Sequence, residues 1–240
     1  GKFIGFHQRE NKNVLVYQIN DSEIQEHPWY NEHGLVRNFY FPKGSESIKL
    51  SLPTGENCFY KIIANKGVTA TLTNKTLVIN KSTPGATLSL QVSKKEVVGH
   101  VKHISPNFKL LTSPGPDLWG WEYKAKGSLA VNQNGSHVQD QIPVPINNPY
   151  GTSMMLTGLS FFDDGRAAVC TLQGDVWIVS GLDQKLEKVT WKRYASGIEI
   201  ALGLLIVNDK VLVAGRDRIT RLHDRNNDGM ADYYESFCQD

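Results

Sequence analysis

Two stretches near the end of the chain, Gly158-Leu-Ser-Phe-Phe-Asp-Asp164 and Gly203-Leu-Leu-Ile-Val-Asn-Asp209, repeat one pattern at an offset of 45 residues. The likeness continues at offsets of 44 and 43 in Arg166-Ala-Ala-Val169 with Lys210-Val-Leu-Val213, and in Asp175-Val-Trp-Ile-Val179 with Arg218-Ile-Thr-Arg-Leu222. Each copy has an apolar run, an Asp-containing turn, a second apolar run, a polar break and a third run. Repeats of ~40 to 45 residues with several strands each are typical of β-propeller blades. The sequence therefore predicts that residues 153–240 form propeller blades.

Two blades do not make a propeller. A propeller closes with at least about four blades, and stacked repeats generally need three or more copies to bury their faces. The pattern thus predicts the first two blades of an incomplete ring. We expect the chain to be the N-terminal part of a longer protein.

Residues 1–105 show short apolar runs separated by turn residues about every 10 residues. Such spacing is typical of an antiparallel β-sandwich or barrel, and we predict a β-sandwich domain. The expected strands are Val14–Ile19, Leu35–Phe41, Ile48–Leu52, Cys58–Ile63, Thr69–Leu72, Leu77–Ile79, Ala86–Val92 and Val97–Val101. The breaks between them include Asn65-Lys-Gly and Thr83-Pro-Gly.

Residues 106–152 hold six of the ten prolines, together with several glycines. This composition predicts an ordered but irregular connector between two domains. Trp119-Gly-Trp121 within it has two interpretations. The indoles form a platform on which a sugar ring stacks, or they hold the connector against a domain, and the second is favoured.

Composition and charge exclude several classes of protein. Lys and Arg number 26 and Asp and Glu 24, for a formal net charge of +2, without the basic excess of a nucleic-acid binder. Residues 1–105 carry +5 and residues 106–240 carry −3, a split that fits two units with solvated surfaces. The longest apolar run, Ala201–Val207, is far shorter than the ~18 to 20 residues of a membrane helix, so no transmembrane segment is expected.

Motifs for catalysis and for cysteine chemistry are missing. Cys58, Cys170 and Cys238 form no C-x-x-C pair, and their pairing is left open. The histidines show no zinc spacing, and the nucleophile elbow, P-loop and dinucleotide fingerprints are absent. The adjacent carboxylates Asp163 and Asp164 precede a glycine, which favours a hairpin turn over an acid and base pair. No catalytic residue is predicted.

The strongest motif runs from Asp224 to Glu235 and fills each position of a twelve-residue calcium loop. Asp, Asn and Asp stand at positions 1, 3 and 5, Gly at 6, a backbone carbonyl at 7, Asp at 9 and Glu at 12. Calcium is a hard cation that takes six to eight oxygen ligands, so this spacing predicts a site made by Asp224, Asn226, Asp228, Met230, Asp232 and Glu235. A strand-like segment precedes the loop where an EF-hand has a helix. The alternative is an acidic hairpin turn whose side chains cap their own backbone.

The same regions resemble a known family. Residues 158–181, Val189-Thr-Trp-Lys-Arg-Tyr-Ala-Ser-Gly197 and 216–235 are similar to the opening blades of large secreted bacterial proteins related to PQQ-dependent sugar dehydrogenases. The start, Gly1–Phe6 with Asn13–Ile19, resembles the β-rich domain that precedes the propeller in that family. The sequence departs from the family at Asn227, where a Gly is usual, and at Ile200-Ala201, where a Pro is usual.

The resemblance implies an exported quinoprotein dehydrogenase that acts on a sugar or small alcohol, with PQQ as cofactor. A cytochrome module in the full-length protein and a periplasmic or extracellular location are implied as well. The family's cofactor-contacting residues are expected in later blades, so none is assigned here, and Arg216 and Arg218 are candidates by residue type alone. The alternative function is a noncatalytic glycan- or protein-binding module in which calcium stiffens one loop.

Overall fold

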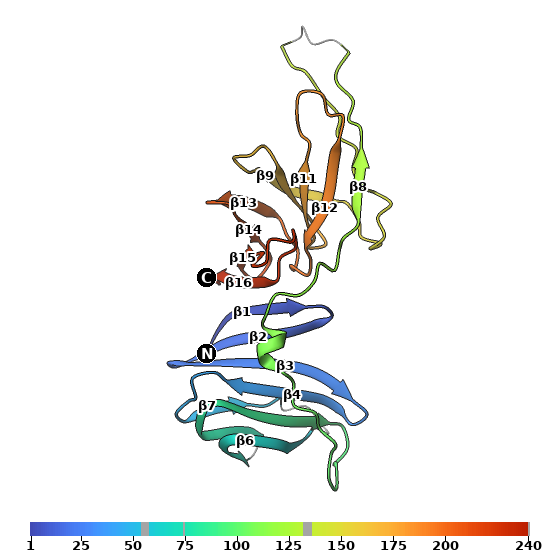
Figure 1. Cartoon of the computed structure of the whole chain (residues 1–240). Coiled ribbons are helices and arrows are strands. Elements are labelled where there is room, and N and C mark those ends of the chain that lie inside the picture. Colours follow the sequence, from blue (N-terminus) through green and yellow to red (C-terminus); the bar gives the residue numbers. More distant parts are fainter. Residues whose placement is uncertain (54–57, 74, 132–135, 240) are drawn as a thin grey trace. The chain divides into compact units, whose positions relative to one another are not determined.

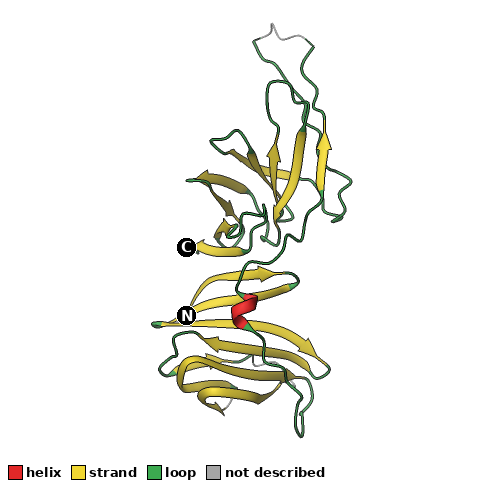
Figure 2. Ribbon diagram, in the orientation of Figure 1, coloured by secondary structure: helices red, strands yellow, loops and turns green. Residues whose placement is uncertain are grey.

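The computed structural model describes residues 1–53, 58–73, 75–131 and 136–239. Within these residues almost every regular element is a strand, and one short helix accompanies them (Figure 2). The prediction of an all-β protein is therefore confirmed. The chain divides into two compact units, unit 1 (Gly1–Pro114) and unit 2 (Gly115–Asp240). No helix of the described residues is both long enough and apolar enough to cross a membrane.

Unit 1 is an antiparallel array whose strands follow one another from β1 to β4 (Figure 1). Strand β4 pairs with the long strand β7, and β7 also pairs with β5 and with β6. The elements are β1 (Lys2–Arg9), β2 (Lys12–Ile19), β3 (Ser22–Asn31), β4 (Gly34–Phe41), β5 (Ile48–Ser51), β6 (Phe59–Thr73), β7 (Thr76–Ser93) and α1 (Phe108–Leu111).

The long β6–β7 hairpin bends as it runs. Its register shifts at three places, Ile62/Ala64, Lys66/Val68 and Thr69/Ala70, and such bulges kink a strand and increase its twist. The second half of β7 pairs with β4, and its first half pairs with β5. Because of the bend, both halves contribute to one core, whose buried members are Ile24, Phe39, Phe41, Ile48, Leu52, Leu77, Ile79, Ala86, Leu88 and Leu90.

The other face of this array carries buried polar side chains. Ser89 Oγ donates a hydrogen bond to Asn38 Oδ1 over 2.8 Å, and His103 Nε2 lies 2.8 Å from the same hydroxyl. Helix α1 is anchored nearby, since Phe108 stacks on Tyr40 with ring centroids 5.1 Å apart. The segment that follows β7 therefore packs on this polar face, and the expected strand Val97–Val101 is wrong because these residues are irregular.

Unit 2 contains two antiparallel meanders of four strands, here called the first copy (β9–β12) and the second copy (β13–β16). A fifth strand, β8, pairs with the outer strand of the first copy. The strands are β8 (Glu122–Ala125), β9 (Leu156–Phe161), β10 (Ala167–Thr171), β11 (Val176–Ser180), β12 (Val189–Ala195), β13 (Gly203–Val207), β14 (Lys210–Ala214), β15 (Ile219–His223) and β16 (Tyr233–Cys238). The repeated sequence stretches thus fall on corresponding strands of two meanders.

The two copies approach each other closely along β9 and β13. A Cβ on Gly158 would lie 3.0 Å from the backbone nitrogen of Leu204. Thr157 Oγ1 donates to the carbonyl of Ala201 over 2.6 Å, and Ser160 Oγ accepts a hydrogen bond from the Ile206 nitrogen. Glycine at 158 is what allows backbones to come this near.

The predicted connector, residues 106–152, is divided between the units. Helix α1 belongs to unit 1, whereas β8 and the residues after it belong to unit 2. Trp121 packs against Tyr123 and Tyr150, and all three cover the core of the first copy. Both indoles of Trp119-Gly-Trp121 therefore have packing partners in unit 2, since Trp119 lies against Arg193.

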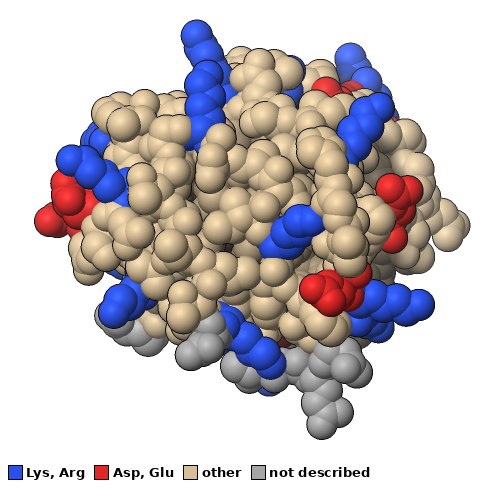
Figure 3. Space-filling model, turned by 90° about the horizontal axis from the view of Figure 1, so that it is seen from below, with Lys and Arg blue, Asp and Glu red and all other residues tan. Residues whose placement is uncertain are grey.

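Surface charges are dispersed on the face drawn in Figure 3. Lys and Arg side chains there are separated by uncharged surface and by single acidic clusters. No basic patch of the kind that binds a phosphate backbone is present on this face. The arrangement suits an ordinary solvated surface.

Candidate functional site

The predicted calcium loop connects β15 to β16, and its own side chains fold it. Asp224 Oδ2 accepts a hydrogen bond from the Gly229 nitrogen over 2.8 Å, and Oδ1 accepts one from the Asp228 nitrogen over 3.3 Å. Asn227 and Gly229 have φ angles of 58° and 84°, a region that Asn and Gly adopt most readily. The departure from Gly at 227 is thus accommodated as a left-handed Asn.

Side chains at loop positions 1, 3 and 5 lie in one turn. Asn226 Nδ2 donates to Asp228 Oδ2 over 2.9 Å, and Asp228 Oδ1 accepts from the Met230 nitrogen over 2.9 Å. Together with the Asp224 contacts, these bonds bring three of the predicted ligand residues together. The same bonds are those expected of a self-capping acidic turn.

The remaining predicted ligands have other partners. Asp232 is 1% exposed, and its carboxylate accepts the Arg225 nitrogen over 2.8 Å and pairs with the Arg225 guanidinium. Glu235 lies on β16 and pairs with Arg221 and with His223, whose Nε2 is 2.7 Å away. Met230 is fully buried. Across the described residues, no three His, Cys, Asp or Glu side chains are arranged to hold a metal ion.

Lys192 places a positive charge beside the loop. Its Nζ donates to the Asp228 carbonyl over 2.6 Å and forms an ion pair with Asp117 over 2.8 Å. A Cβ on Gly229 would lie 2.8 Å from the same Nζ. The lysine is 36 residues from Asp228 in sequence, so the spacing of the loop motif does not predict this contact.

A cleft of about 630 Å³ adjoins the loop in unit 2. One wall comes from β11 and β12, and the other from β14 and β15. Its lining includes hydroxyls, carboxylates and apolar groups, among them Ile178, Ser180, Thr190, Lys192, Tyr194, Asp209, Val211 and Asp224. Burial, reinforced by the Asp224 carboxylate, raises the pKa of Tyr194 above that of an ordinary tyrosine.

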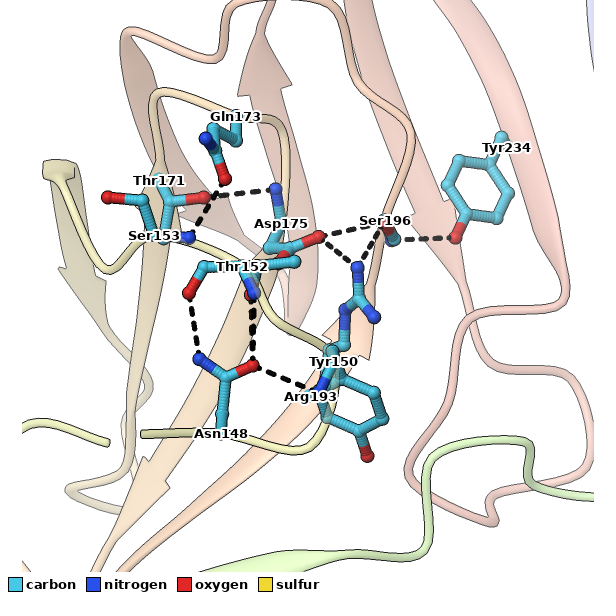
Figure 4. Close-up of polar contacts among 10 residues, drawn as sticks. All are labelled: Asn148, Tyr150, Thr152, Ser153, Thr171, Gln173, Asp175, Arg193, Ser196 and Tyr234. Atoms are coloured by element: carbon cyan, nitrogen blue, oxygen red, sulfur yellow. Dashed lines mark hydrogen bonds and ion pairs between the residues drawn. The ribbon is translucent and has the colours of Figure 1, made fainter. Parts of the chain in front are cut away.

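A second polar cluster lies inside the first copy and was not anticipated from the sequence (Figure 4). Asp175 and Arg193 are almost fully buried and form an ion pair. Ser196 Oγ donates to Asp175 Oδ1 over 2.7 Å, and the Ser196 nitrogen donates to the Tyr234 hydroxyl over 3.2 Å. Because Tyr234 belongs to β16, the cluster links the two copies.

Aromatic rings enclose the guanidinium of this cluster. The Cζ of Arg193 lies 4.9 Å from the ring centroid of Trp119 and 4.6 Å from that of Tyr150, within the range of cation–π attraction. Burial also raises the pKa of Tyr150. Asn148 shapes the segment that carries Tyr150, since its amide donates to the Thr152 carbonyl over 2.8 Å.

The two carboxylates that precede Gly165 occupy a hairpin turn between β9 and β10. Asp164 pairs with Arg166 over 2.7 Å, and hydrogen bonds from the backbone and side chain of Arg166 lower the pKa of Asp164. A carboxyl group with a lowered pKa is a poor general acid. This geometry agrees with the turn interpretation.

The arginines of unit 2 take part in ion pairs. Each of them has a carboxylate partner among the described residues, including Arg216 with Glu199 and Arg218 with Asp217. No contact with PQQ is assigned to any of them. The three cysteines are free thiols.

Comparisons with known proteins give no relative. No family model, no curated protein and no solved structure matches the chain. Its function is therefore inferred from its own residues.

Proposed function

We propose that unit 2 contains the first two blades of a β-propeller and that the loop from Asp224 to Asp232 binds one Ca²⁺. Two adjacent four-stranded meanders with matching strands support the propeller. For unit 1, the bent β6–β7 hairpin, both halves of which line one core, supports the proposed β-sandwich. The chain would then be the N-terminal part of a longer, exported protein.

One observation carries the calcium proposal: the Asp224 carboxylate caps the backbone of Asp228 and Gly229 and so closes the turn that holds Asn226. The loop offers the side chains of Asp224, Asn226 and Asp228 and the carbonyl of Met230, and water would complete the shell. Since calcium takes six to eight oxygens, four protein ligands beside a lysine favour weak binding. We expect a dissociation constant of about 10⁻⁴ to 10⁻³ M, the range of extracellular modules.

Calcium in this loop would have a structural role. It would neutralise the repulsion between the Asp224 and Asp228 carboxylates and fix the connection between β15 and β16. A periplasmic or extracellular location suits such weak affinity. Unit 2 would then be a scaffold whose β15–β16 connection is stiffened by calcium.

Asp228→Asn tests the site sharply. The substitution keeps a side-chain oxygen that can accept from the Met230 nitrogen but removes one charge from the loop. Calorimetry with calcium should give a clear heat for the natural chain and a strongly reduced one for the variant. Asp209→Asn, in the exposed β13–β14 turn, is the matched control and should leave the heat unchanged. No heat and no thermal shift with millimolar calcium would reject the site.

The cleft beside the loop favours a second candidate, a noncatalytic module that binds a carbohydrate or another protein. Ser180 and Thr190 line it with hydroxyl groups, and Ile178 and Val211 line it with apolar side chains. Carbohydrate binding is tested by titrating the protein with a panel of neutral oligosaccharides and following the NMR chemical shifts of its backbone amides. Shifts restricted to the cleft support it, and their absence for every sugar removes it.

The quinoprotein dehydrogenase suggested by resemblance is a proposal about the longer protein. Its sugar or alcohol substrate, its PQQ and its cytochrome module would all require residues beyond those described. Because the arginines of unit 2 are engaged in ion pairs, we derive no step through PQQ. Dye reduction by the full-length protein with PQQ and calcium tests this role.

A further inference from the structure

A pocket of about 680 Å³ lies beside the turn between β10 and β11, and the segment that precedes β9 forms most of its lining. This volume is within the ~300 to 1,000 Å³ of small-molecule sites. The pocket, here called the amide pocket, is lined by Trp121, Gln173 and residues within 146–153, and none of these described lining residues carries a charge. Its polar lining consists of three side-chain amides and two hydroxyls, from Asn147, Asn148, Gln173, Thr152 and Ser153.

Hydrogen bonds hold the 146–153 segment in a defined shape. Asn148 Oδ1 accepts from the nitrogen and the hydroxyl of Thr152 over 3.3 and 3.2 Å, and Asn148 Nδ2 donates to the Thr152 carbonyl over 2.8 Å (Figure 4). Gln173 Oε1 accepts from the Ser153 nitrogen over 2.8 Å, which ties the segment to the turn between β10 and β11. A site that is ordered before binding loses less conformational entropy when a ligand enters.

The side chains that hold this shape keep hydrogen-bonding capacity for a ligand. Gln173 accepts through its oxygen, and a side-chain amide also has two N–H donors. The Thr152 hydroxyl donates to Asn148, and a hydroxyl oxygen can accept as well. Asn147, Ser153 and Gln173 are exposed at the surface of the pocket. The lining therefore offers both donors and acceptors.

Trp121 gives the pocket a flat apolar wall. Its ring meets Tyr150 edge to face, with centroids 6.2 Å apart and an interplanar angle of 90°, and it stacks with Tyr123 at 6.2 Å. These contacts fix the orientation of the indole. The residue is nevertheless only half-buried and lines the pocket, so packing in unit 2 and contact with a ligand are compatible for this tryptophan.

An indole beside uncharged amides and hydroxyls matches the chemistry of a pyranose sugar. Such a ring has C–H groups on its faces and hydroxyls around its edge. The electron-rich face of an indole attracts the C–H groups, and amides and hydroxyls both donate to and accept from sugar hydroxyls. A charged ligand would lose hydration without meeting an opposite charge in the lining. The lining thus favours a neutral ligand rich in hydroxyls.

We propose that the amide pocket binds a neutral sugar unit of a glycan. Trp121 is the stacking surface, and Asn147, Ser153 and Gln173 are the hydrogen-bond partners. The pocket shares no lining residue with the cleft of about 630 Å³ and includes no residue of the predicted calcium loop. This inference therefore goes beyond the proposed function and does not depend on it.

Titration of the whole chain with neutral gluco-, manno-, galacto- and xylo-oligosaccharides, followed by NMR chemical shifts, tests the site. At least one sugar should shift the amides of residues 146–153 and 173 and the indole N–H of Trp121. Shifts at Ser180 and Thr190 alone would support binding in the cleft and overturn this inference. The absence of shifts at the amide pocket with every sugar would overturn it too, as would shifts there with a proline-rich peptide and with no sugar.

Two tryptophans in the same short motif provide a matched pair of variants. Trp121→Leu keeps an apolar side chain against Tyr150 but removes the flat face, and it should weaken binding of the best sugar at least about tenfold, or about 1.4 kcal/mol. Trp119 lies against Arg193 and is not among the lining residues, so Trp119→Leu should change the affinity by less than about twofold. Equal affinities in the two variants would overturn the stacking role.

A third variant separates binding from folding, because Trp121→Leu also removes packing. The side chain of Asn147 is exposed, so Asn147→Ala should leave the thermal unfolding of the chain unchanged. Loss of its hydrogen bond to the sugar should weaken binding by about three- to tenfold. Natural affinity in both Asn147→Ala and Trp121→Leu would place the sugar elsewhere and overturn the proposal. Failure of the chain to bind calcium would leave all these outcomes unchanged, so the two proposals fail separately.

Discussion

The first and second copies in unit 2 share a strand plan but differ in what covers them. In the first copy, all residues of β10 are buried, and Trp177 and Val179 lie beneath a cover that includes Val144, Tyr150 and Met154. In the second copy, several large apolar side chains are exposed: Leu205 at 58%, Val207 at 44% and Phe237 at 46%. Burial differs most between β10, which is buried throughout, and β14, which alternates. The cover of the first copy does not reach all of β9, where Leu159 and Phe161 are 59% and 61% exposed.

The first copy buries both members of an ion pair, whereas the equivalent position of the second copy carries an arginine that pairs with an exposed carboxylate. Asp175 corresponds to Arg218 in the repeat, and Arg218 pairs with the exposed Asp217. Enclosure by Trp119 and Tyr150 is what shields the Asp175–Arg193 pair. A four-stranded meander can therefore hold an ion pair in its interior or at its surface, and the interior pair requires other side chains to enclose it.

The largest effect is expected from breaking the buried pair. Arg193→Met leaves Asp175 as an uncompensated buried charge, which costs about 3 to 5 kcal/mol of unfolding free energy. Denaturant unfolding measures the loss. Arg216→Met removes an exposed pair of the second copy and should cost at most about 1 kcal/mol. Equal costs for the two variants would contradict the difference between the copies.

A smaller effect separates two glycines at equivalent positions. A Cβ on Gly158 would meet the Leu204 nitrogen at 3.0 Å and Cys170 Sγ at 3.1 Å, whereas one on Gly203 would meet only Ala214 Cβ at 3.8 Å. Gly158→Ala should therefore destabilise by about 1 to 3 kcal/mol through overpacking, and Gly203→Ala should be close to neutral. Thermal unfolding of the two variants measures the difference in their stability loss. A neutral Gly158→Ala would mean that the copies are not tightly apposed.

Acid should weaken unit 1 through His103, whose partly buried ring lies 2.8 Å from the Ser89 hydroxyl. Burial lowers the pKa of His103 below its ordinary value of 6.5, so the folded state favours the neutral ring. Its contribution to stability is full above about pH 6.5 and is lost as the pH falls through the lowered folded pKa. The free energy of unfolding of unit 1, measured from pH 8 to pH 5, should begin to fall below about pH 6.5. His103→Gln should flatten the profile, and an unchanged profile would contradict the assignment.

The smallest effect is expected in the hairpin turns of the two copies. Asn208 and Asp209 have φ angles of 48° and 57°, as in a type I′ turn, where Asn-Gly is preferred. Asp209→Gly should therefore stabilise the second copy by about 0.5 kcal/mol, since Gly adopts positive φ freely. In the first copy, Gly165 at φ 86° already has this freedom, and Gly165→Ala should destabilise by about 1 kcal/mol. Denaturant unfolding of both variants under the same conditions should show a higher unfolding free energy for Asp209→Gly and a lower one for Gly165→Ala.

Local sequence patterns predicted the first three strands of each copy but not the fourth. The repeat stops after β11 and β15 because β12 and β16 have unrelated residues, and the connection before β16 holds the loop that begins at Asp224. Strand β8 lies in the Pro-rich region and has no apolar period to indicate it. Its position depends on pairing with β12, which is a long-range contact.

In unit 1, turn residues gave a misleading signal. Asn65-Lys-Gly and Thr83-Pro-Gly predict breaks between strands, yet β6 and β7 continue through them as bent strands. Gly67 and Gly85 have φ angles of 68° and 78°, so these residues serve bulges and bends rather than chain reversals. Local composition cannot distinguish the two uses, because both need the same backbone conformation.

For the predicted calcium loop, spacing predicted which residues share the turn but not which residues the other predicted ligands pair with. Asp224, Asn226 and Asp228 lie together because their hydrogen bonds are local. Asp232 and Glu235 instead pair with Arg225, Arg221 and His223, and these pairings depend on how β15 and β16 align. Lys192 and the Asp175–Arg193 pair join residues far apart in sequence and were for that reason missed.

The buried indoles of the first copy have a spectroscopic consequence. Trp177 is fully buried and Trp191 nearly so, and neither ring nitrogen has a hydrogen-bond partner among the described residues. Indoles in such dry surroundings emit at shorter wavelengths than hydrated ones and are poorly reached by iodide. Their fluorescence therefore reports on the interior of the first copy. A shift of this emission to longer wavelength would show that water has entered that interior.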